Sequence, residues 1–164
     1  VINNYMATLT SNKNFLSPVG FTLKINSTRY ANLEYFCSTV SIPTLNMAGA
    51  DVPYQGINFT TTGESITFGE LSITANVTED FDNYIETFNW MHTLANSRGK
   101  AAEDAKEDAT LMVYTSHNNI SKQIRFKGIF PTSISELAFD TKTESLEYVQ
   151  MTVGFSYTNF EFIE

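Results

Sequence analysis

The sequence predicts a mainly β protein, a sandwich or barrel of about seven or eight antiparallel strands with one flanking α-helix. Three observations support this class. Apolar and polar residues alternate along most of the chain, with the period of two that is typical of strands with one buried face. Turn-forming residues separate these segments, and only one stretch has a clear helical period. The thirteen Phe and eight Tyr of the 164 residues supply large apolar side chains for the core of a single domain, residues 1–164.

The N-terminal part of the chain supplies the first two strands. Residues 1–17 are polar and are expected to form an arm that precedes the domain. A strand over residues 19–26 places alternate apolar side chains on one face, and a second over residues 33–41 ends before Pro43. The apolar phase of the second strand shifts near Ser38, which predicts a β-bulge.

Residues 44–56 are predicted to form a long loop, because they contain two Gly and one Pro and show neither a helical nor a strand period. The segment is also more apolar than a simple linker. We therefore expect it to pack on another subunit or ring, through Met47, Val52 and Tyr54.

Two further strands follow, over residues 57–62 and 65–78. In the second of these, the apolar phase changes between Phe68 and Leu71. A bulge at Gly69 would reconcile the two phases, because glycine tolerates the backbone that a bulge requires.

One amphipathic helix is predicted over residues 79–96, with Thr78 as its N-cap. Trp90 and Leu94 lie on the side opposite the apolar stripe. They either pack beneath a loop of the same chain or contact a neighbouring subunit, since Trp is rarely left exposed and is enriched at interfaces. The stripe expected to face the core consists of Phe81, Tyr84, Ile85, Phe88, Met91 and Ala95.

The C-terminal part begins with a charged segment, residues 97–109, which is expected to be a solvated loop containing one poorly formed helical turn. A β-hairpin follows, with strands over residues 111–115 and 120–127 and a turn between them. The chain then turns again at residues 128–131, which include Phe130 and Pro131. We assign these two residues to a subunit or ring interface as well.

The last strand is the longest. It is expected over residues 147–157, where five alternate positions from Val149 to Tyr157 form an apolar face. Residues 159–162 continue the alternation and could extend strand pairing beyond the domain. A strand of this length needs partners or protection on both edges.

The charge and cysteine content narrow the function. The formal net charge of −8 argues against nucleic-acid affinity, which depends on Lys and Arg. The single cysteine, Cys37, excludes an internal disulfide and fits a reducing compartment. No apolar run approaches the roughly 20 residues of a membrane-spanning helix.

No catalytic constellation is present in the sequence. The two histidines, His92 and His117, fall on the helix and in a hairpin turn, and no motif for a nucleophile, a phosphate or a metal accompanies them. We therefore expect no catalytic, cofactor or metal site, no small-molecule substrate and no enzymatic activity.

A series of segments resembles the tail tube proteins of contractile-tailed, T-even-type bacteriophages, which are related to the tubes of contractile injection systems. The segments, in order, are YFCSTVSIP, VPYQGINF, ELSITANVTED, FDNYIETFNWM and KGIFPTSISELAFDTKTESLEYVQMTVGFSY. They cover about residues 18–157, in the order and spacing of that family. The N-terminal arm and the final TNFEFIE are not distinctive.

The resemblance implies an assembly. Six subunits would form a ring whose inner sheets join into one β-barrel around a lumen, and rings would stack into the inner tube of a contractile tail. The implied partners are further copies of the chain, the tail sheath, the baseplate hub or initiator and the tail terminator. Genomic DNA would pass through the lumen into the host without specific binding. Such a protein belongs to the virion and is assembled in the host cytoplasm.

The same resemblance implies that the loop over residues 44–56 stacks one ring on the next. Six copies at −8 each would give −48 per ring, and an inner wall poor in cations would let DNA slide. The sequence does not show how this charge divides between the lumen and the exterior.

Three alternatives share some of these features. A baseplate tube initiator, or the tube of an injection system or tailocin, would have the same fold. A carbohydrate-binding β-sandwich would explain the aromatic residues and the acidity, but it would act as a monomer. An enzyme on a β-barrel scaffold would need catalytic residues that the sequence does not nominate.

Overall fold

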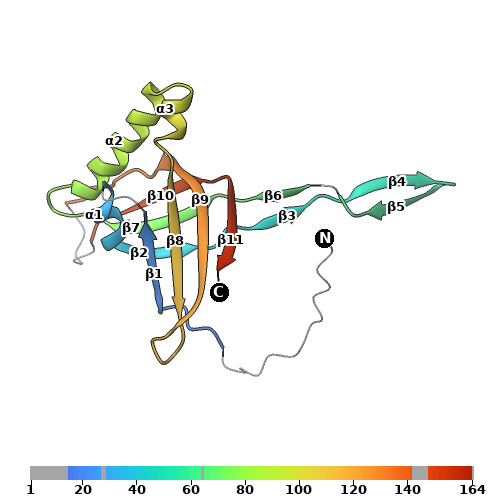
Figure 1. Ribbon diagram of the computed structural model, residues 1–164, viewed down its shortest axis with the longest axis horizontal. Coiled ribbons are helices and arrows are strands. Elements are labelled where there is room, and N and C mark those ends of the chain that lie inside the picture. Colours follow the sequence, from blue (N-terminus) through green and yellow to red (C-terminus); the bar gives the residue numbers. More distant parts are fainter. Residues whose placement is uncertain (1–14, 27–28, 64, 142–147, 164) are drawn as a thin grey trace.

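The computed structural model describes residues 15–26, 29–63, 65–141 and 148–163. Most of the arm expected over residues 1–17, and the expected beginning of the last strand at residue 147, therefore lie outside the described residues. A body of sheets and helices carries a long two-stranded ribbon that projects to one side (Figure 1). The predicted class, mainly β with a flanking helix, is confirmed.

The first half of the chain contains β1 (Phe21–Ile25), α1 (Ala31–Tyr35), β2 (Cys37–Ser41), β3 (Leu45–Met47), β4 (Ala50–Tyr54), β5 (Ile57–Thr61), β6 (Ile66–Phe68) and β7 (Leu71–Asn76). The second half contains α2 (Asp82–Asn96), α3 (Lys100–Glu103), β8 (Glu107–Tyr114), β9 (Ile120–Ile134), β10 (Gln150–Ser156) and β11 (Asn159–Ile163).

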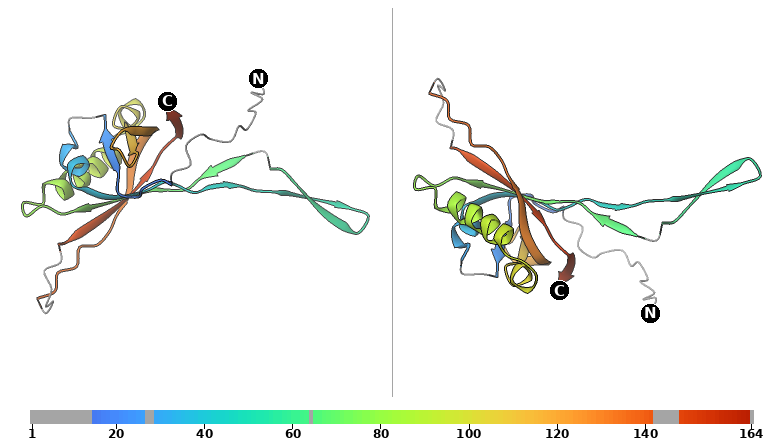
Figure 2. Two further views of the ribbon diagram at one scale, coloured as in Figure 1. Left: turned by 90° about the horizontal axis from the view of Figure 1, so that it is seen from below. Right: turned by 90° about the horizontal axis from the view of Figure 1, so that it is seen from above.

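Two antiparallel sheets share the long strand β9. The β8 sheet has β1, β8, β9 and β11 in spatial order, and the β7 sheet has β9, β10, β7 and β2. Residues 120–129 of β9 pair with β8, whereas residues 130–134 pair with β10. Figure 2 shows the two sheets diverging, with α2 beside them. The core fills the space between the sheets and the helix.

The turn expected at residues 128–131 is wrong, because β9 runs through these positions. The chain bends there instead of reversing: Gly128 has a φ of 61°, which favours glycine, and its N–H donates to Asp108 Oδ1 at 2.9 Å. Pro131 is accepted within the strand because residues 130–134 have a strand partner on one side only among the described residues.

The strand expected over residues 33–41 is half wrong. Residues 31–35 form the short helix α1, which buries Leu33 and leaves Tyr35 exposed, so these two side chains do not share a strand face. The backbone N–H of Ile25 donates to Glu34 Oε2 at 2.9 Å and ties α1 to β1. The expected bulge near Ser38 is confirmed by a register shift between Cys37 and Thr39.

The phase change between Phe68 and Leu71 marks a change of sheet and not a bulge within one strand. Residue Phe68 ends β6 in the ribbon, and Leu71 begins β7 in the body. Between them the N–H of Gly69 donates to the carbonyl of Thr44 at 2.8 Å, which closes the base of the ribbon.

The loop predicted over the charged residues 97–109 is shorter in the structure than expected. It contains the helix α3, and β8 already begins at Glu107, four residues before the expected start. The hairpin that follows, with its turn between β8 and β9, is confirmed. At the C-terminus, β11 pairs with β9 inside the same subunit, so residues 159–162 do not extend pairing beyond the domain.

Candidate assembly surfaces

The ribbon, residues 45–68, is the most prominent surface feature. From here on we call this ribbon the arm; it is distinct from the N-terminal arm expected over residues 1–17. Strand β3 pairs with β6 near the body, and β4 pairs with β5 toward the tip. The expected loop over residues 44–56 is therefore one strand of a β-ribbon and not a loop. The turn at the tip is made by Gln55 and Gly56, both with positive φ, as a two-residue hairpin turn requires.

Each half of the arm has an apolar and a polar face. The register places Val52 opposite Phe59 in the outer half, while Thr60 donates to Asp51 Oδ1 at 2.8 Å on the other face. The apolar side chains of the arm are largely exposed; Ile57, for example, keeps 61% of its accessible surface. The exposed apolar residues are Leu45, Met47, Val52, Ile57, Phe59, Ile66 and Phe68.

A two-stranded ribbon without a cover is only marginally stable in water. The arm is held to the body at its base, where the ring of Phe68 lies edge-on to Tyr157 and Phe160 at centroid distances of 6.0 and 5.6 Å. The hydroxyl of Tyr157 also donates to the carbonyl of Gly69 at 3.0 Å. The arm is thus a fixed projection at its base and an uncovered apolar surface along its length.

Two strand edges of the β7 sheet are free within the described chain. Strand β2 pairs only with β7, and residues 130–134 of β9 pair only with β10. An apolar groove of about 300 Å³ lies at the β2 edge, between the two sheets. Its apolar lining includes Phe21, Val40, Ile42, Leu111 and Val113.

The two sides of α2 are the reverse of the prediction. The helix turns Asn83, Thr87 and Trp90 toward the core, and it leaves Phe88 53% exposed. The polar groups on the core side are satisfied: Asn83 Nδ2 donates to the carbonyl of Asn76 at 2.7 Å, and Thr87 Oγ1 donates to the carbonyl of Asn83 at 2.9 Å. Because these residues are polar, hydrophobicity marked the wrong face of the helix. The expected stripe is therefore wrong at its exposed members, Phe81, Ile85, Phe88 and Ala95.

The beginning of α2 also differs from the prediction. The helix starts at Asp82, not Glu79, and Phe81 has a left-handed backbone before it. The prediction of Thr78 as the N-cap is therefore wrong, because Phe81 takes that position; the hydroxyl of Thr78 nevertheless accepts the N–H of Asp82 at 3.0 Å.

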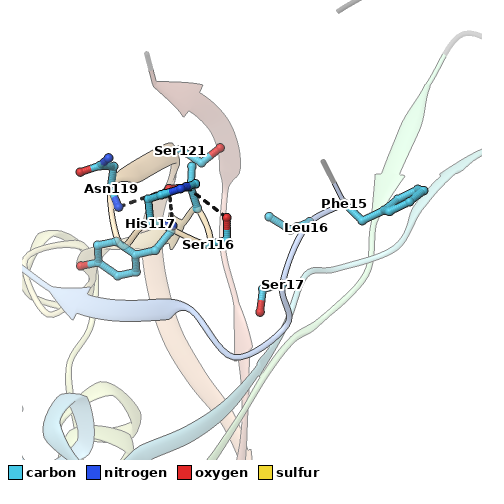
Figure 3. A pocket seen from close by; sticks show the side chains of 9 residues that line it. Phe15, Leu16, Ser17, Ser116, His117, Asn119 and Ser121 are labelled. Carbon is cyan, nitrogen blue, oxygen red and sulfur yellow. Dashed lines mark hydrogen bonds between the residues drawn. The ribbon is translucent and has the colours of Figure 1, made fainter. Parts of the chain in front are cut away.

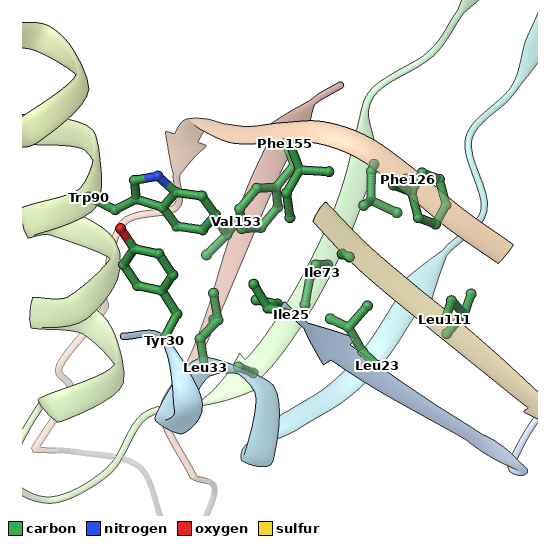
Figure 4. Close-up of a cluster of buried hydrophobic side chains, with 14 of the residues drawn as sticks. Leu23, Ile25, Tyr30, Leu33, Ile73, Trp90, Leu111, Phe126, Val153 and Phe155 are labelled. Atoms are coloured by element: carbon green, nitrogen blue, oxygen red, sulfur yellow. The ribbon is translucent and has the colours of Figure 1, made fainter. Parts of the chain in front are cut away.

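Trp90 belongs to the core of its own subunit, so its expected place at an interface is corrected (Figure 4). Its side chain is 1% exposed and stacks on Tyr30, with ring centroids 4.0 Å apart. Its Nε1 donates to the carbonyl of Ala105 at 2.8 Å. Of the two alternatives that the sequence left open, packing within the chain is the one that the structure contains.

The remaining residues assigned to interfaces lie in different places. Leu94 is partly buried against the core. Pro131 is buried. Phe130 is half-buried, and Lys106 Nζ lies 5.5 Å from the centre of its ring. Both residues lie in the part of β9 that has a free edge. Met47 and Val52 are exposed on the arm. Tyr54 is the last residue of β4, at the tip.

Cys37 is expected to react slowly with alkylating reagents in the folded subunit. Burial raises the pKa of its thiol from 9.0 to about 11, and a backbone hydrogen bond with Thr39 opposes this in part. At pH 8 the reactive thiolate fraction falls from about 10% to about 0.1%, so we expect alkylation about 100-fold slower than in denaturant and faster as the pH rises toward 11. Equal rates for the folded and unfolded chain in a mass-spectrometric time course would contradict this.

A cavity of about 440 Å³ lies between residues 15–17 and the turn that joins β8 to β9 (Figure 3). Its lining is hydroxyl-rich and includes His117, which lies 3.3 Å from Ser116 Oγ through Nδ1. The N–H groups of His117 and Asn119 donate to Thr115 Oγ1, so the polar groups serve the hairpin turn. No acid or cysteine is among the lining residues that the structure describes.

In the described part of the chain, no three or more His, Cys, Asp or Glu side chains gather in a way that could hold a metal ion. None of the helices in that part has the length and apolarity needed to cross a bilayer.

The fold is that of tube and cap proteins from contractile injection systems. The tube-terminating cap of the anti-feeding prophage matches with a TM-score of 0.71, at 12% identity, over 98% of each chain. A chain of the sheath–tube complex of the extracellular contractile injection system PVC matches with a TM-score of 0.66, at 15% identity, over 96% of this chain and 99% of that one. Hcp1 from Flavobacterium johnsoniae matches with a TM-score of 0.54, at 16% identity, over 87% and 94%.

These likenesses show the fold and confirm, at that level, the expected relation to tubes of contractile tails. No family model matches the sequence, and no curated protein matches it either.

Proposed function

We propose that the protein is a tube-type structural subunit of a contractile, phage-like machine, and that it works by assembling into hexameric rings that stack. The observation that carries this proposal is the arm: an amphipathic ribbon whose apolar side chains are largely exposed, on a fold shared with tube and cap proteins. An exposed apolar surface of this extent is typical of an interaction site. No catalytic activity is part of the proposal.

Ring closure is proposed through the free edges of the β7 sheet. The strands alternate in direction from β9 through β10 and β7 to β2, so β2 of one subunit and β9 of the next would run antiparallel. Pairing these edges around a ring satisfies their backbone groups and removes both edges at once. The apolar groove beside β2 offers the neighbour additional surface to bury.

Ring stacking is proposed through the arm, which would lay its apolar face on a subunit of the next ring. In this proposal the exposed Met47 and Val52 belong to the apolar surface that contacts the neighbouring ring. Tyr54 lies at the tip of the arm. The body cannot supply this cover itself, because the arm projects away from it (Figure 1). Phe130, at the free end of β9, belongs to the contact within a ring.

The proposed outer partner is a sheath, which would face the helix side of the subunit. The exposed side of α2 presents Ile85 and Phe88, and the exposed Phe81 lies just before the helix, beside its acidic start. A solved neighbour is itself a sheath–tube complex, and another comes from a baseplate. A baseplate hub or initiator and a terminator would complete the two ends.

Within this class we propose the inner tube of a contractile phage tail, located in the virion and assembled in the host cytoplasm, with the genome passing through the lumen. The sequence resemblance to T-even-type tubes supports the phage assignment. The injection-system or tailocin tube, with the same fold, is the alternative.

A tube-terminating cap is a second candidate, because the anti-feeding prophage cap is a structural neighbour over nearly the whole chain. A cap and a tube subunit differ in whether rings stack without limit. The two functions therefore predict different assemblies from one purified protein.

Negative-stain electron microscopy and mass photometry of the purified protein, over a range of concentrations, test the proposal. Six-fold rings that stack into long hollow tubes are the expected result. Rings that remain single, or stop at a pair, would favour the cap. A monomer at all concentrations, including in the presence of a baseplate initiator, would contradict both candidates and leave the carbohydrate-binding module as the next hypothesis.

A further inference from the structure

The arm and the start of α2 lie at opposite ends of the β7 sheet. Strand β2 leads toward the arm after Ser41, and β7 begins at Leu71 where the chain returns from it. At the other end of the sheet, Asn76 of β7 lies opposite Gln150 of β10. Figure 1 shows the arm at one end of the long axis of the molecule and the segment between β7 and α2 at the other. The length of the sheet therefore separates the two features.

An exposed aromatic patch lies at the end of the sheet opposite the arm. Phe139 and Tyr148 keep 70% and 85% of their accessible surface, and Phe81 is exposed as well. The ring centroids of Phe81 and Phe139 lie 6.3 Å apart. With Val77 and Val149, these three side chains form the apolar lining of a pocket of about 260 Å³. We call these five residues the end patch.

Backbone hydrogen bonds hold the end patch in place. The N–H of Val77 donates to the carbonyl of Val149 at 2.8 Å, just beyond the paired residues of β7 and β10. Phe81 has a φ of 60°, which is unfavourable for a bulky residue, and its N–H donates to the carbonyl of Thr78 at 3.0 Å. The chain thus accepts an unfavourable backbone at the position where the ring of Phe81 packs against Phe139.

The end patch fits apolar side chains of a protein better than a small-molecule ligand. Small-molecule sites usually have volumes of about 300–1,000 Å³, above that of this pocket. The apolar face of the arm, with the exposed Val52 and Ile57, is a surface of matching chemistry on the same chain. Residues 45–68 contain no Lys or Arg that could pair with the exposed Glu79 and Asp80 beside the patch. A contact between arm and patch would therefore depend on apolar burial.

The proposed ring places these two surfaces on opposite sides. Strands of a closed barrel tilt by about 35–45° from its axis, so the two ends of a strand lie toward different rims. Subunits related by rotation about the ring axis all present the same end to the same side. If the β7 sheets close the ring, every arm leaves from one rim and every end patch lies at the other. The arms of one ring then face the end patches of the next.

We infer that the end patch is the acceptor site for the arm of a second copy of this chain, in the next ring. The inference rests on the proposed function and adds to it the surface on which the arm docks. One strand of the arm, residues 45–54, spans about 33 Å at about 3.3 Å per residue, whereas the six residues of β7 span about 20 Å. The arm is therefore long enough to cover the end patch and to continue along the neighbour.

An arm-to-patch contact joins rings head to tail. Each ring that docks its arms keeps its own end patches free for the next ring, so the stack grows without closing. The exposed Ile85 and Phe88, farther along α2, remain available to the proposed outer partner.

A charge in the end patch is expected to stop stacking and leave the rings intact. Phe139→Asp would place an unpaired carboxylate under the docked arm, and because Phe139 is exposed, the subunit should still fold. Phe162→Asp, the same substitution at an exposed ring on β11, is the matched control and should form tubes as the wild type does. Electron microscopy counts rings and tubes, and thermal unfolding checks the fold. Tyr148→Asp replaces Phe139→Asp if that variant does not fold. Long tubes from the folded patch variant would overturn the inference.

A mixture of two defective variants tests whether arm and patch belong to one contact. Val52→Asp damages the arm and leaves the end patch intact, whereas Phe139→Asp does the reverse. Rings of each variant alone should remain single. In the mixture, intact arms of one ring can dock on intact patches of the other, and the resulting pair has no further working surface. Pairs of rings and nothing longer are the expected result. A mixture that contains only single rings would contradict the inference.

Cross-linking tests the contact directly. Val52→Cys and Tyr148→Cys are combined in a Cys37→Ser background, and assembled tubes are treated with a short bismaleimide. We expect linked subunits in tubes and none in single rings. Asp51→Cys, on the other face of the arm, replaces Val52→Cys as the control and should give no linked subunits above background. Equal cross-linking from both faces, or none from Val52→Cys, would show that the arm docks elsewhere.

The failure of the inference differs from the failure of the proposed function. Tubes that form in spite of a charged end patch would refute the acceptor site alone. A wild-type chain that forms neither rings nor tubes would refute the proposed function.

Discussion

Excision of the arm is expected to yield a folded subunit that forms rings but no tubes. Residues 45–68 would be replaced by an Asn-Gly turn that joins Thr44 to Gly69. These two residues are already linked by a hydrogen bond of 2.8 Å, so a short turn can close the gap without moving β2 or β7. The arm contributes little to the core, because its apolar side chains are largely exposed.

The measurement is electron microscopy together with thermal unfolding. We expect the unfolding temperature of the excised subunit to stay within a few degrees of the full chain, while long tubes disappear. Long tubes from the excised protein would contradict the assignment of stacking to the arm. Loss of the subunit fold would show that the arm, through Phe68 and its contacts with Tyr157 and Phe160, supports the body more than its exposure suggests.

A matched pair of point variants separates the two faces of the arm. Phe59→Asp puts a carboxylate on the apolar face, and Asn58→Asp puts one on the polar face at the next position of β5. If a neighbouring copy covers the apolar face, Phe59→Asp should prevent stacking, since an unpaired charge would have to be buried. Asn58→Asp should stack as the wild type does. Equal behaviour of the two variants would argue against a one-sided contact.

Trp90→Ala is expected to destabilise the subunit itself by about 3–5 kcal/mol. The indole is buried, stacks on Tyr30, lies 5.7 Å from the ring centre of Phe155 and donates its N–H to Ala105. Its removal leaves a cavity and an unsatisfied carbonyl beneath the segment that leads into β8. For a domain of this size the loss corresponds to a fall in unfolding temperature of roughly 10 °C.

Phe88→Ala is the matched control, because it removes an aromatic ring from the opposite, exposed side of α2. Its effect on the isolated subunit should be within about 0.5 kcal/mol. Calorimetry or denaturant unfolding of the monomeric variants measures the change in the free energy of unfolding for each. A Trp90→Ala subunit as stable as wild type but unable to form rings would restore the interface role that the sequence suggested.

Strand periodicity determined most of the fold class from the sequence alone. Residues Leu23 and Ile25, and the set Met151, Val153 and Phe155, alternate with polar residues and are buried in the structure, because a period of two follows directly from strand geometry. The mainly β class, the flanking helix and the hairpin between β8 and β9 could therefore be predicted. Met47, Val52 and Tyr54 were proposed as interface residues for a different reason: their segment is too apolar for a linker, although it was taken for a loop.

The arm could have been recognised as a strand pair. Leu45 and Met47 alternate with a polar residue, and so do Ala50, Val52 and Tyr54. Gly49 interrupts the run, which concealed the period. The tip turn made by Gln55 and Gly56 was a second signal, since Gly supports a positive φ.

Only the tertiary structure decided which face of α2 packs, where β9 bends and how the sheets divide. The core side of the helix carries Asn83 and Thr87, whose polar groups are satisfied by backbone carbonyls, so hydrophobicity could not identify it. A turn and a strand bend at Gly128 have the same local sequence; pairing with β8, β10 and β11 makes it a bend. The sequence by itself thus determined the mainly β class and most strands of the body. Contacts between residues far apart in the chain decided that Trp90 belongs to the core, because long-range packing and pairing outweigh local pattern.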